Sequence, residues 1–427
     1  MLLIKNGRVI DPETGMDEVA DILTDSETII KIGKNLSPQG DCMVIDAEGF
    51  VVSPGFIDVH VHFRDPGFTY KEDISTGSMA AARGGYTTVV CMANTKPPVD
   101  NAETLEYILN KAKDSPIHVL QTACITKGMR GTELVDMELL KDKGAVGFSD
   151  DGYPIMNSLL VMKAMKEAER LNVPVSFHEE DPSLIESAGI NQGKISEAMG
   201  LGGASHLAED VMVARDCAIA SAIGAKVNIQ HLSSGISVEI IRCARRNGTN
   251  ITAESSPHHF SMTEVDILKY GTNAKMNPPL RTEQDRIKII EGLADDTIQI
   301  IATDHAPHSS EEKMQEFTKS PSGIIGLETA LAVGITQLVD KGHLSLLKLL
   351  EKMTVNPAKL YNLRTGRLQE GHPADMVIFG PEEKWTVSGF SSKSSNSPLV
   401  GTELTGKVKY TICRGMVVYE DKTNQWF

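Results

Sequence analysis

Between residues 55 and 305, short apolar segments alternate eight times with amphipathic segments, and this alternation restricts the fold more than any other feature. The apolar segments are rich in Val and Ile and are typical of buried strands, ending near residues 62, 93, 123, 150, 178, 231, 254 and 304. Helical periodicity lies between them at 104–113, 159–171 and 209–223, and a last helix is expected at 325–339. Eight such units predict a (β/α)₈ TIM barrel over residues 55–364.

The two ends of the chain have a different pattern, of short apolar strands separated by glycine-containing turns. These predicted strands cover residues 2–4, 7–10, 28–32, 43–46, 375–379, 408–413 and 415–419. Each end alone has too few strands to be stable. We therefore predict that residues 1–54 and 365–427 pair into one small β-sandwich domain beside the barrel.

The composition argues against several classes of protein. The 427 residues include 57 acidic and 42 basic residues, giving a net charge of −15, whereas nucleic-acid binding depends on basic patches. No run of 18 apolar residues is present, and the first residues become polar too early for a signal peptide. The six cysteines form no CxxC pair, which favours free thiols. We expect a cytoplasmic protein that binds neither nucleic acid nor membrane.

Metal-binding side chains occur repeatedly at the ends of the predicted strands. His60 and His62 end the first strand, and their spacing of two places both imidazoles on the same face. The later strand ends carry Asp150 and Asp151, His178, His231 and Asp304. The C-terminal ends of barrel strands meet at one mouth, where active sites lie. A single histidine is more often structural, but this convergence predicts a metal site.

Arg64 lies two residues after His62 and would place a fixed cation beside this metal site. A chain with a net negative charge needs such a local positive group to bind an anion, so we expect an anionic substrate. The charged run of Glu311, Glu312 and Lys313 is interpreted as an exposed, solvated loop.

Two segments resemble the signature segments of the dihydroorotase family, which belongs to the amidohydrolase superfamily of metal-dependent barrels. They are residues 58–67 (DVHVHFRDPG) and 302–308 (ATDHAPH), the second followed after five residues by Lys313. Residues 94–95 (NT) and 277–281 (NPPLR) are also similar to the family pattern. The resemblance extends over essentially the whole chain.

The resemblance implies two zinc ions per chain. Their ligands would be His60, His62, Asp151, His178, His231 and Asp304. In many relatives a carboxylated lysine from the fourth strand bridges the two metals, but this strand end has no lysine. The chain resembles the branch with a bridging aspartate, whose pattern points to Asp151, while Asp150 stays open as the alternative.

The resemblance also implies the reaction, which is the reversible cyclisation of N-carbamoyl-L-aspartate to L-dihydroorotate in pyrimidine biosynthesis. Zinc would activate a water for attack on the ring amide, and catalytic Asp304 would carry its proton to the departing nitrogen. Arg64 would bind the substrate carboxylate through its planar guanidinium. The implied substrate-binding residues are His62, Phe63, Arg64, Asn94, Asn277, His308, Ser322 and Gly323.

Two other functions stay open at this point. A hydantoinase or allantoinase would use the same metal site, but a hydantoin lacks the carboxylate that suits Arg64 and Asn94. A non-catalytic dihydroorotase-like scaffold would be expected to lack ligands, whereas all six positions are filled here. Family analogy leaves open a homodimer and an association with aspartate carbamoyltransferase. Iron, cobalt or manganese would suit the same ligands as zinc.

Overall fold

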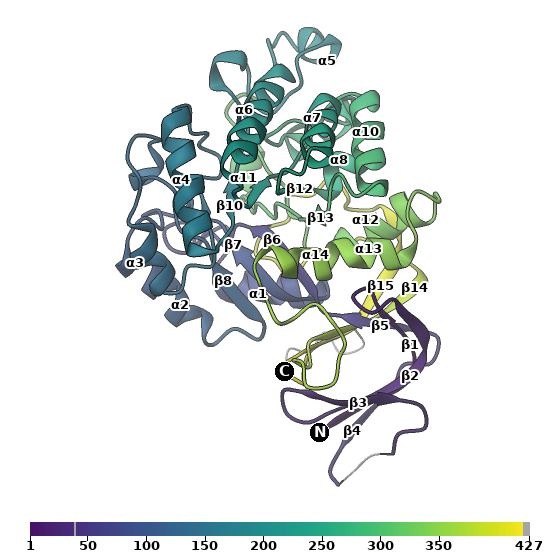
Figure 1. Cartoon of the computed structure of the whole chain (residues 1–427). Coiled ribbons are helices and arrows are strands. Elements are labelled where there is room, and N and C mark those ends of the chain that lie inside the picture. Colours follow the sequence, from purple (N-terminus) through teal and green to yellow (C-terminus); the bar gives the residue numbers. More distant parts are fainter. Residues whose placement is uncertain (38–39, 422–427) are drawn as a thin grey trace.

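A closed barrel of eight parallel strands forms the centre of the protein (Figure 1). The computed structural model describes residues 1–37 and 40–421. The barrel strands are β6 (Phe56–Val61), β7 (Tyr86–Cys91), β8 (His118–Gln121), β9 (Phe148–Ser149), β10 (Val175–Phe177), β11 (Val227–Ile229), β12 (Ile251–Ser255) and β13 (Ile300–Ile301). Strands β6–β8 and β9–β13 form two sheets, which single bridges from Ala123 to Phe148 and from Val61 to His305 join at both seams. The predicted TIM barrel is confirmed.

Helices cover the outside of the barrel and present their apolar faces to it. The longer ones are α1 (Ile74–Arg83), α2 (Ala102–Ala112), α3 (Met137–Asp142), α4 (Ser158–Leu171), α6 (Leu207–Ile223), α7 (Gly235–Arg246), α10 (Glu283–Ala294), α13 (Leu346–Met353) and α14 (Val355–Leu360). Short helices are α5 (Lys194–Ala198), α8 (Pro257–Ser261), α9 (Ile267–Tyr270), α11 (Ser310–Lys313) and α12 (Ala330–Gly334). Among the described residues, no helix is long and apolar enough to cross a membrane.

The last predicted helix begins later than expected. The sequence predicts a helix from residue 325, but Ile324 still bridges to His305, and the backbone N–H of Gly326 donates to the His305 ring. Helix α12 therefore starts only at Ala330, and a π-helical segment continues it through Ile335–Val339.

Strands from the two ends of the chain form one eight-stranded sheet, seen in Figure 1 as purple strands beside yellow ones. Its strands are β1 (Leu2–Asp11), β2 (Met16–Thr24), β3 (Ile29–Gly33), β4 (Met43–Asp46), β5 (Val51–Pro54), β14 (Met376–Thr386), β15 (Glu403–Cys413) and β16 (Met416–Glu420). Antiparallel pairing of β5 with β14 joins the two ends. The sheet has an apolar cluster of its own. Two of these strands were not predicted from the sequence: β2, whose first half is polar and exposed, and β5.

A segment of the C-terminal part leaves this sheet and lies against the barrel. We call residues 391–396, between β14 and β15, the strap. Its first two backbone N–H groups, of Ser391 and Ser392, donate to the carboxylate of Glu328. We propose residues 55–364 as one domain and residues 1–54 plus 365–427 as the other. The strap belongs to the second domain and lies against the first.

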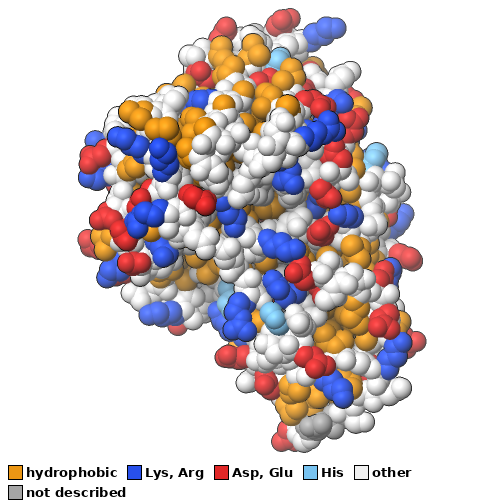
Figure 2. Space-filling model, viewed as in Figure 1, with side chains coloured by type: hydrophobic (Ala, Val, Ile, Leu, Met, Phe, Trp, Pro, Cys, Tyr) orange, Lys and Arg blue, Asp and Glu red, His pale blue; other side chains and the backbone are white. Residues whose placement is uncertain are grey.

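On the face drawn in Figure 2, acidic, basic and apolar side chains are interspersed rather than gathered by sign.

Candidate metal centre

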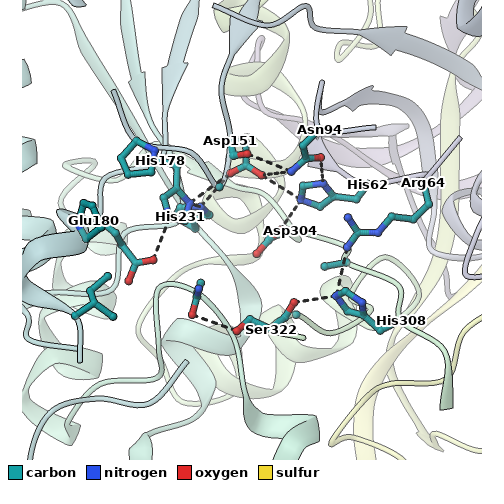
Figure 3. Close-up of a pocket in the computed structure, with 17 residues that line it drawn as sticks. His62, Arg64, Asn94, Asp151, His178, Glu180, His231, Asp304, His308 and Ser322 are labelled. Atoms are coloured by element: carbon teal, nitrogen blue, oxygen red, sulfur yellow. Dashed lines mark hydrogen bonds and ion pairs between the residues drawn. The ribbon is translucent and has the colours of Figure 1, made fainter. Parts of the chain in front are cut away.

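The strand ends bring all six predicted metal ligands to one mouth of the barrel. These residues are His60 and His62 from the end of β6, and Asp151, His178, His231 and Asp304 after β9, β10, β11 and β13. Each is at most 7% exposed. Except for His60, they line a cavity of about 320 Å³, and Figure 3 shows them pointing toward one another.

Three residues of this mouth have a backbone conformation that L-residues rarely adopt. The φ angles are +59° at Arg64, +32° at His231 and +49° at Asp304. Such conformations cost on the order of 1–3 kcal/mol each and persist where the surrounding structure requires them. Their concentration here marks the mouth as a functional site.

Asp151 lies between two groups of histidines. Its Oδ1 is 3.5 Å from His60 Nε2, from His178 Nδ1 and from His231 Nε2. Its Oδ2 is 3.5 Å from His62 Nε2. Two metal-binding clusters, each of three residues, therefore share this carboxylate. This geometry allows the one carboxylate to contact an ion in each cluster.

Asp150 has a different environment. Its Oδ1 accepts hydrogen bonds from the backbone N–H groups of Ile125 and Thr126, at 2.7 and 3.1 Å, and its Oδ2 accepts from the Thr126 hydroxyl. Burial raises the pKa of Asp150 to about 6. Since its acceptor positions are occupied by the loop after β8, the geometry supports Asp151 as the bridging residue.

Several ligand atoms are spaced as they would be around a shared metal ion, whereas His178 Nδ1 and His231 Nε2, at 2.9 Å, and His62 Nε2 and Asp304 Oδ1, at 3.0 Å, lie within hydrogen-bond distance. Two atoms bound at 2.0–2.2 Å to one tetrahedral zinc lie about 3.4 Å apart. The distances of 3.5 Å around Asp151, and of 3.6 Å from His60 Nε2 to Asp304 Oδ1, are close to this value. His60 Nε2 and Asp151 Oδ1 are also buried without a hydrogen-bond partner. Imidazole and carboxylate ligands suit zinc.

The charges of the site likewise favour cations. Burial would lower the pKa of His60, but Asp151 and Glu254 raise it well above the usual range. At His178, burial would likewise lower the pKa, but Asp151 and Glu180 raise it to about 10. Burial would raise the pKa of Asp151, yet the histidines, His60 foremost, lower it well below normal. The negative charge of the buried carboxylates thus holds protons on His60 and His178, and the same charge would attract metal ions.

Hydrogen bonds from neighbouring side chains orient two of the ligands. Asn94 Oδ1 accepts from His62 Nδ1 at 2.9 Å, which turns His62 Nε2 toward Asp304 Oδ1 at 3.0 Å. Glu180 accepts from His178 Nε2 at 3.0 Å. Carboxylates in this position fix the orientation of a ligating imidazole. Glu180 was not predicted from the sequence, although its position two residues after a strand-end histidine could have indicated it.

Arg64 and His308 form a basic corner on another side of the cavity. Arg64 Nη2 is 3.4 Å from His308 Nε2, and Nε donates to the carbonyl of Pro307 at 3.2 Å. His308 donates from Nε2 to the carbonyl of Ser322 at 2.8 Å, and its Nδ1 accepts from Lys71. Burial, then Arg64 and Lys71, lower the pKa of His308, which keeps it neutral. This corner can receive an anion.

Residues 51–418 match the amidohydrolase family. The dihydroorotase of Clostridioides difficile is 62% identical over 419 residues, covering 98% of this chain and 100% of that protein. The dihydroorotase of Clostridium acetobutylicum is 59% identical over 424 residues, covering 99% and 100%. The chain belongs to the dihydroorotase family.

Solved structures with the same fold include other cyclic amidohydrolases. An L-hydantoinase (dihydropyrimidinase) from Arthrobacter aurescens superposes with a TM-score of 0.87 at 27% identity, covering 100% of this chain and 97% of that one. A dihydropyrimidinase from Brevibacillus agri gives 0.86 at 23% identity, covering 99% and 95%, and supports the fold alone. This dihydroorotase-family chain therefore shares its architecture with a wider group than its sequence relatives.

The other predicted substrate-binding residues of this dihydroorotase-family chain meet at the same cavity, with one exception. Asn277, Ser322 and Gly323 line it, and the Ser322 hydroxyl donates to Asn277 Oδ1 at 3.2 Å. The side chain of Phe63 does not reach the cavity. It packs on Gly77 of α1 in the apolar core, whereas the neighbouring His62 lines the cavity.

Lys313 also differs from expectation. The charged run around it predicts an exposed side chain, but Lys313 is only 6% exposed, and this prediction is wrong. Its Nζ donates to the carbonyls of Pro321 and Gly323, and burial lowers its pKa to about 7. Lys313 therefore fastens the loop that carries Ser322 and Gly323. Residues of the cavity lining that the sequence did not indicate are Gly152, Pro154, Glu180, Pro182, Ile185 and Ala306.

Loading the metal-free protein with zinc at pH 7 is expected to release about two protons per chain. The pKa values of His60 and His178 are raised, the latter to about 10, so both imidazoles carry protons that a metal must displace. Metal affinity should therefore rise with pH up to about 10. Calorimetric titration in buffers of different ionisation enthalpy measures the release. Binding without any proton release would contradict the raised pKa values.

Proposed function

We propose that this mouth binds two zinc ions and catalyses the reversible cyclisation of N-carbamoyl-L-aspartate to L-dihydroorotate in pyrimidine biosynthesis. The observation that carries the proposal is the position of Asp151 between two ligand clusters, with Arg64 lining the same cavity. Relatives 50–62% identical that are named dihydroorotase support the same reaction.

The six ligands would divide between the two ions. His60, His62 and Asp304 would hold one ion, His178 and His231 would hold the other, and Asp151 would contribute to both. When bound, the cations supply an activated water and a Lewis acid for the ring carbonyl.

Asp304 moves the proton in this scheme. Its carboxylate accepts the proton of the attacking water and delivers it to the ring nitrogen that leaves. Burial would raise the pKa of Asp304, but its hydrogen bond to His62 and the charge of His60 lower it, so the carboxylate is ionised. In the biosynthetic direction the same transfers run backwards and close the ring.

The remaining polar residues bind the substrate. Arg64, with Asn94 and His308 beside it, binds the ring carboxylate, since a guanidinium matches a carboxylate with two parallel hydrogen bonds. Asn277 and the segment of Ser322 and Gly323 contact the ring edges. All of these line the cavity opposite or beside the metal ligands.

Replacing Arg64 by methionine is expected to lower kcat/KM for dihydroorotate by about 30- to 1000-fold, equal to roughly 2–4 kcal/mol. The methionine removes the charge-assisted bonds to the carboxylate but leaves the metal ligands intact. Steady-state assays of ring opening and closure measure the effect. The matched control is Arg130→Met, because Arg130 is exposed and outside the cavity lining. An Arg64→Met enzyme with wild-type kcat/KM would overturn the role of Arg64.

A hydantoinase activity is the second candidate, favoured by the 27% identical L-hydantoinase structure. A hydantoin has no carboxylate for Arg64, so the basic corner would serve no purpose with that substrate. Comparing wild-type turnover of hydantoin and of dihydroorotate separates the two activities, and we expect dihydroorotate to be much the better substrate.

We also propose zinc as the native metal, a cytoplasmic location, and a homodimer able to associate with aspartate carbamoyltransferase. The free state of all six cysteines supports a reducing compartment. Metal analysis of the purified protein distinguishes zinc from iron, cobalt and manganese, and light scattering gives the oligomeric state.

A further inference from the structure

The strap contacts the loop that follows β6 and carries Arg64. The Ser394 hydroxyl donates to the carbonyl of Lys71 at 2.7 Å, and Lys393 Nζ donates to the carbonyl of Thr69 at 2.7 Å. Lys71 in turn donates to His308 Nδ1. A segment more than 300 residues away in sequence therefore holds one side of the basic corner.

Asn396, the last residue of the strap, holds the other side. Its Nδ2 donates to the carbonyls of Ala306 and Gly323 at 3.0 and 3.1 Å. Its Oδ1 accepts from the backbone N–H of His308 at 3.1 Å, and its own carbonyl accepts from Ile325 at 3.1 Å. The residue is only 4% exposed and is absent from the catalytic cavity lining. It therefore acts on this loop and not on the substrate.

The loop at Gly323 is closely packed, so small displacements of it are costly. The φ angle of Gly323 is +124°, and an added Cβ would lie 2.6 Å from the Cβ of Ala306. The Gly323 carbonyl also accepts from Lys313 Nζ at 3.1 Å, next to the bond from Asn396. These two buried donors, Lys313 Nζ and Asn396 Nδ2, therefore fix the position of Ser322 and Gly323 relative to Arg64.

We propose that Asn396 is a positioning residue for substrate binding, which holds His308 and Gly323 at the place where they meet the carboxylate and ring. This inference rests on the proposed function and extends it to a residue outside the cavity. We therefore predict that replacing Asn396 weakens substrate binding but leaves the metal centre intact, because none of the hydrogen-bond partners of Asn396 is a metal ligand.

The test compares Asn396→Ala and Asn396→Asp with the control Ser395→Ala in the zinc-loaded, full-length enzyme. We expect the alanine variant to raise KM for dihydroorotate about tenfold, with kcat within about twofold and zinc content unchanged. The aspartate variant keeps the acceptor for His308 but sets an oxygen against two carbonyls, so its KM should rise at least as much. Ser395 is exposed and should behave as wild type.

A second measurement separates positioning from a general loss of stability. Competition by orotate, which has a ring carboxylate, should weaken about tenfold in Asn396→Ala, matching the change in KM. Unchanged KM in both Asn396 variants, or a parallel loss of zinc and kcat, would overturn the inference. A wild-type enzyme that does not turn over dihydroorotate would instead overturn the proposed function.

Discussion

Replacing Asp304 by asparagine is expected to lower kcat for dihydroorotate by about 10²- to 10⁴-fold, the usual contribution of a general acid–base residue. Asparagine retains an oxygen for the metal but cannot accept and return the proton. Asp304 Oδ1 lies 3.0 Å from His62 Nε2 and 3.6 Å from His60 Nε2, so the side chain stands among the proposed metal ligands. Steady-state kinetics in both directions measure the loss.

The control for this substitution is Asp17→Asn, which changes an aspartate paired with Arg8 on the surface of the terminal sheet. It should retain wild-type kcat. Zinc analysis of Asp304→Asn is needed beside the kinetics, because loss of metal would also stop turnover. A metal-loaded Asp304→Asn enzyme that keeps more than about a tenth of wild-type kcat would exclude the proton-transfer role.

The second large effect is expected at Asp151, the proposed bridging residue. Asp151→Asn removes the negative charge shared by both clusters, so the chain should lose at least one zinc ion and kcat should fall by about 10³-fold or more. The fall in kcat is expected because the attacking water loses its proton at neutral pH only when metal ions lower its pKa from 15.7 to about 7. Zinc content per chain after dialysis is the direct measurement.

Asp150→Asn is the matched comparison, since it makes the same chemical change one residue away. Asp150 accepts hydrogen bonds from the backbone of Ile125 and Thr126 and is absent from the metal clusters. An amide nitrogen facing those donors should destabilise the fold by about 1–3 kcal/mol while zinc binding persists. The opposite pattern, with zinc lost in Asp150→Asn and kept in Asp151→Asn, would assign the bridge to Asp150.

Much of the fold could be predicted because its elements follow local periodicity. The eight barrel strands have short apolar runs whose ends could be located within a few residues, and a parallel barrel brings those ends together by geometry. Strand β2 could not be predicted because its first residues, such as Asp17 and Glu18, are charged and exposed. The late start of α12 could not be predicted because Ile324 pairs with His305, a contact that no local pattern indicates.

The candidate site divides in the same way. The histidines at strand ends could be identified as ligand candidates from residue type and position alone, and resemblance to a family assigned roles to them. The inward direction of Asp151, the outward packing of Phe63 and the burial of Lys313 depend on which neighbours surround each side chain. Those neighbours come from distant parts of the chain.

By itself, the sequence determined the barrel and the set of metal-binding residue types, because these follow from spacing between near neighbours, and its motifs indicated the family by resemblance. Only the tertiary structure showed that Asp151 lies between two histidine clusters while Asp150 is hydrogen-bonded elsewhere, that Glu180 accepts from His178, and that Asn396 contacts the loop of His308. The bond from His308 to Asn396 spans 88 residues, and that from His62 to Asp304 spans 242. Contacts of such separation exist only after the barrel has closed and the strap has crossed it, so no local pattern of residues encodes them.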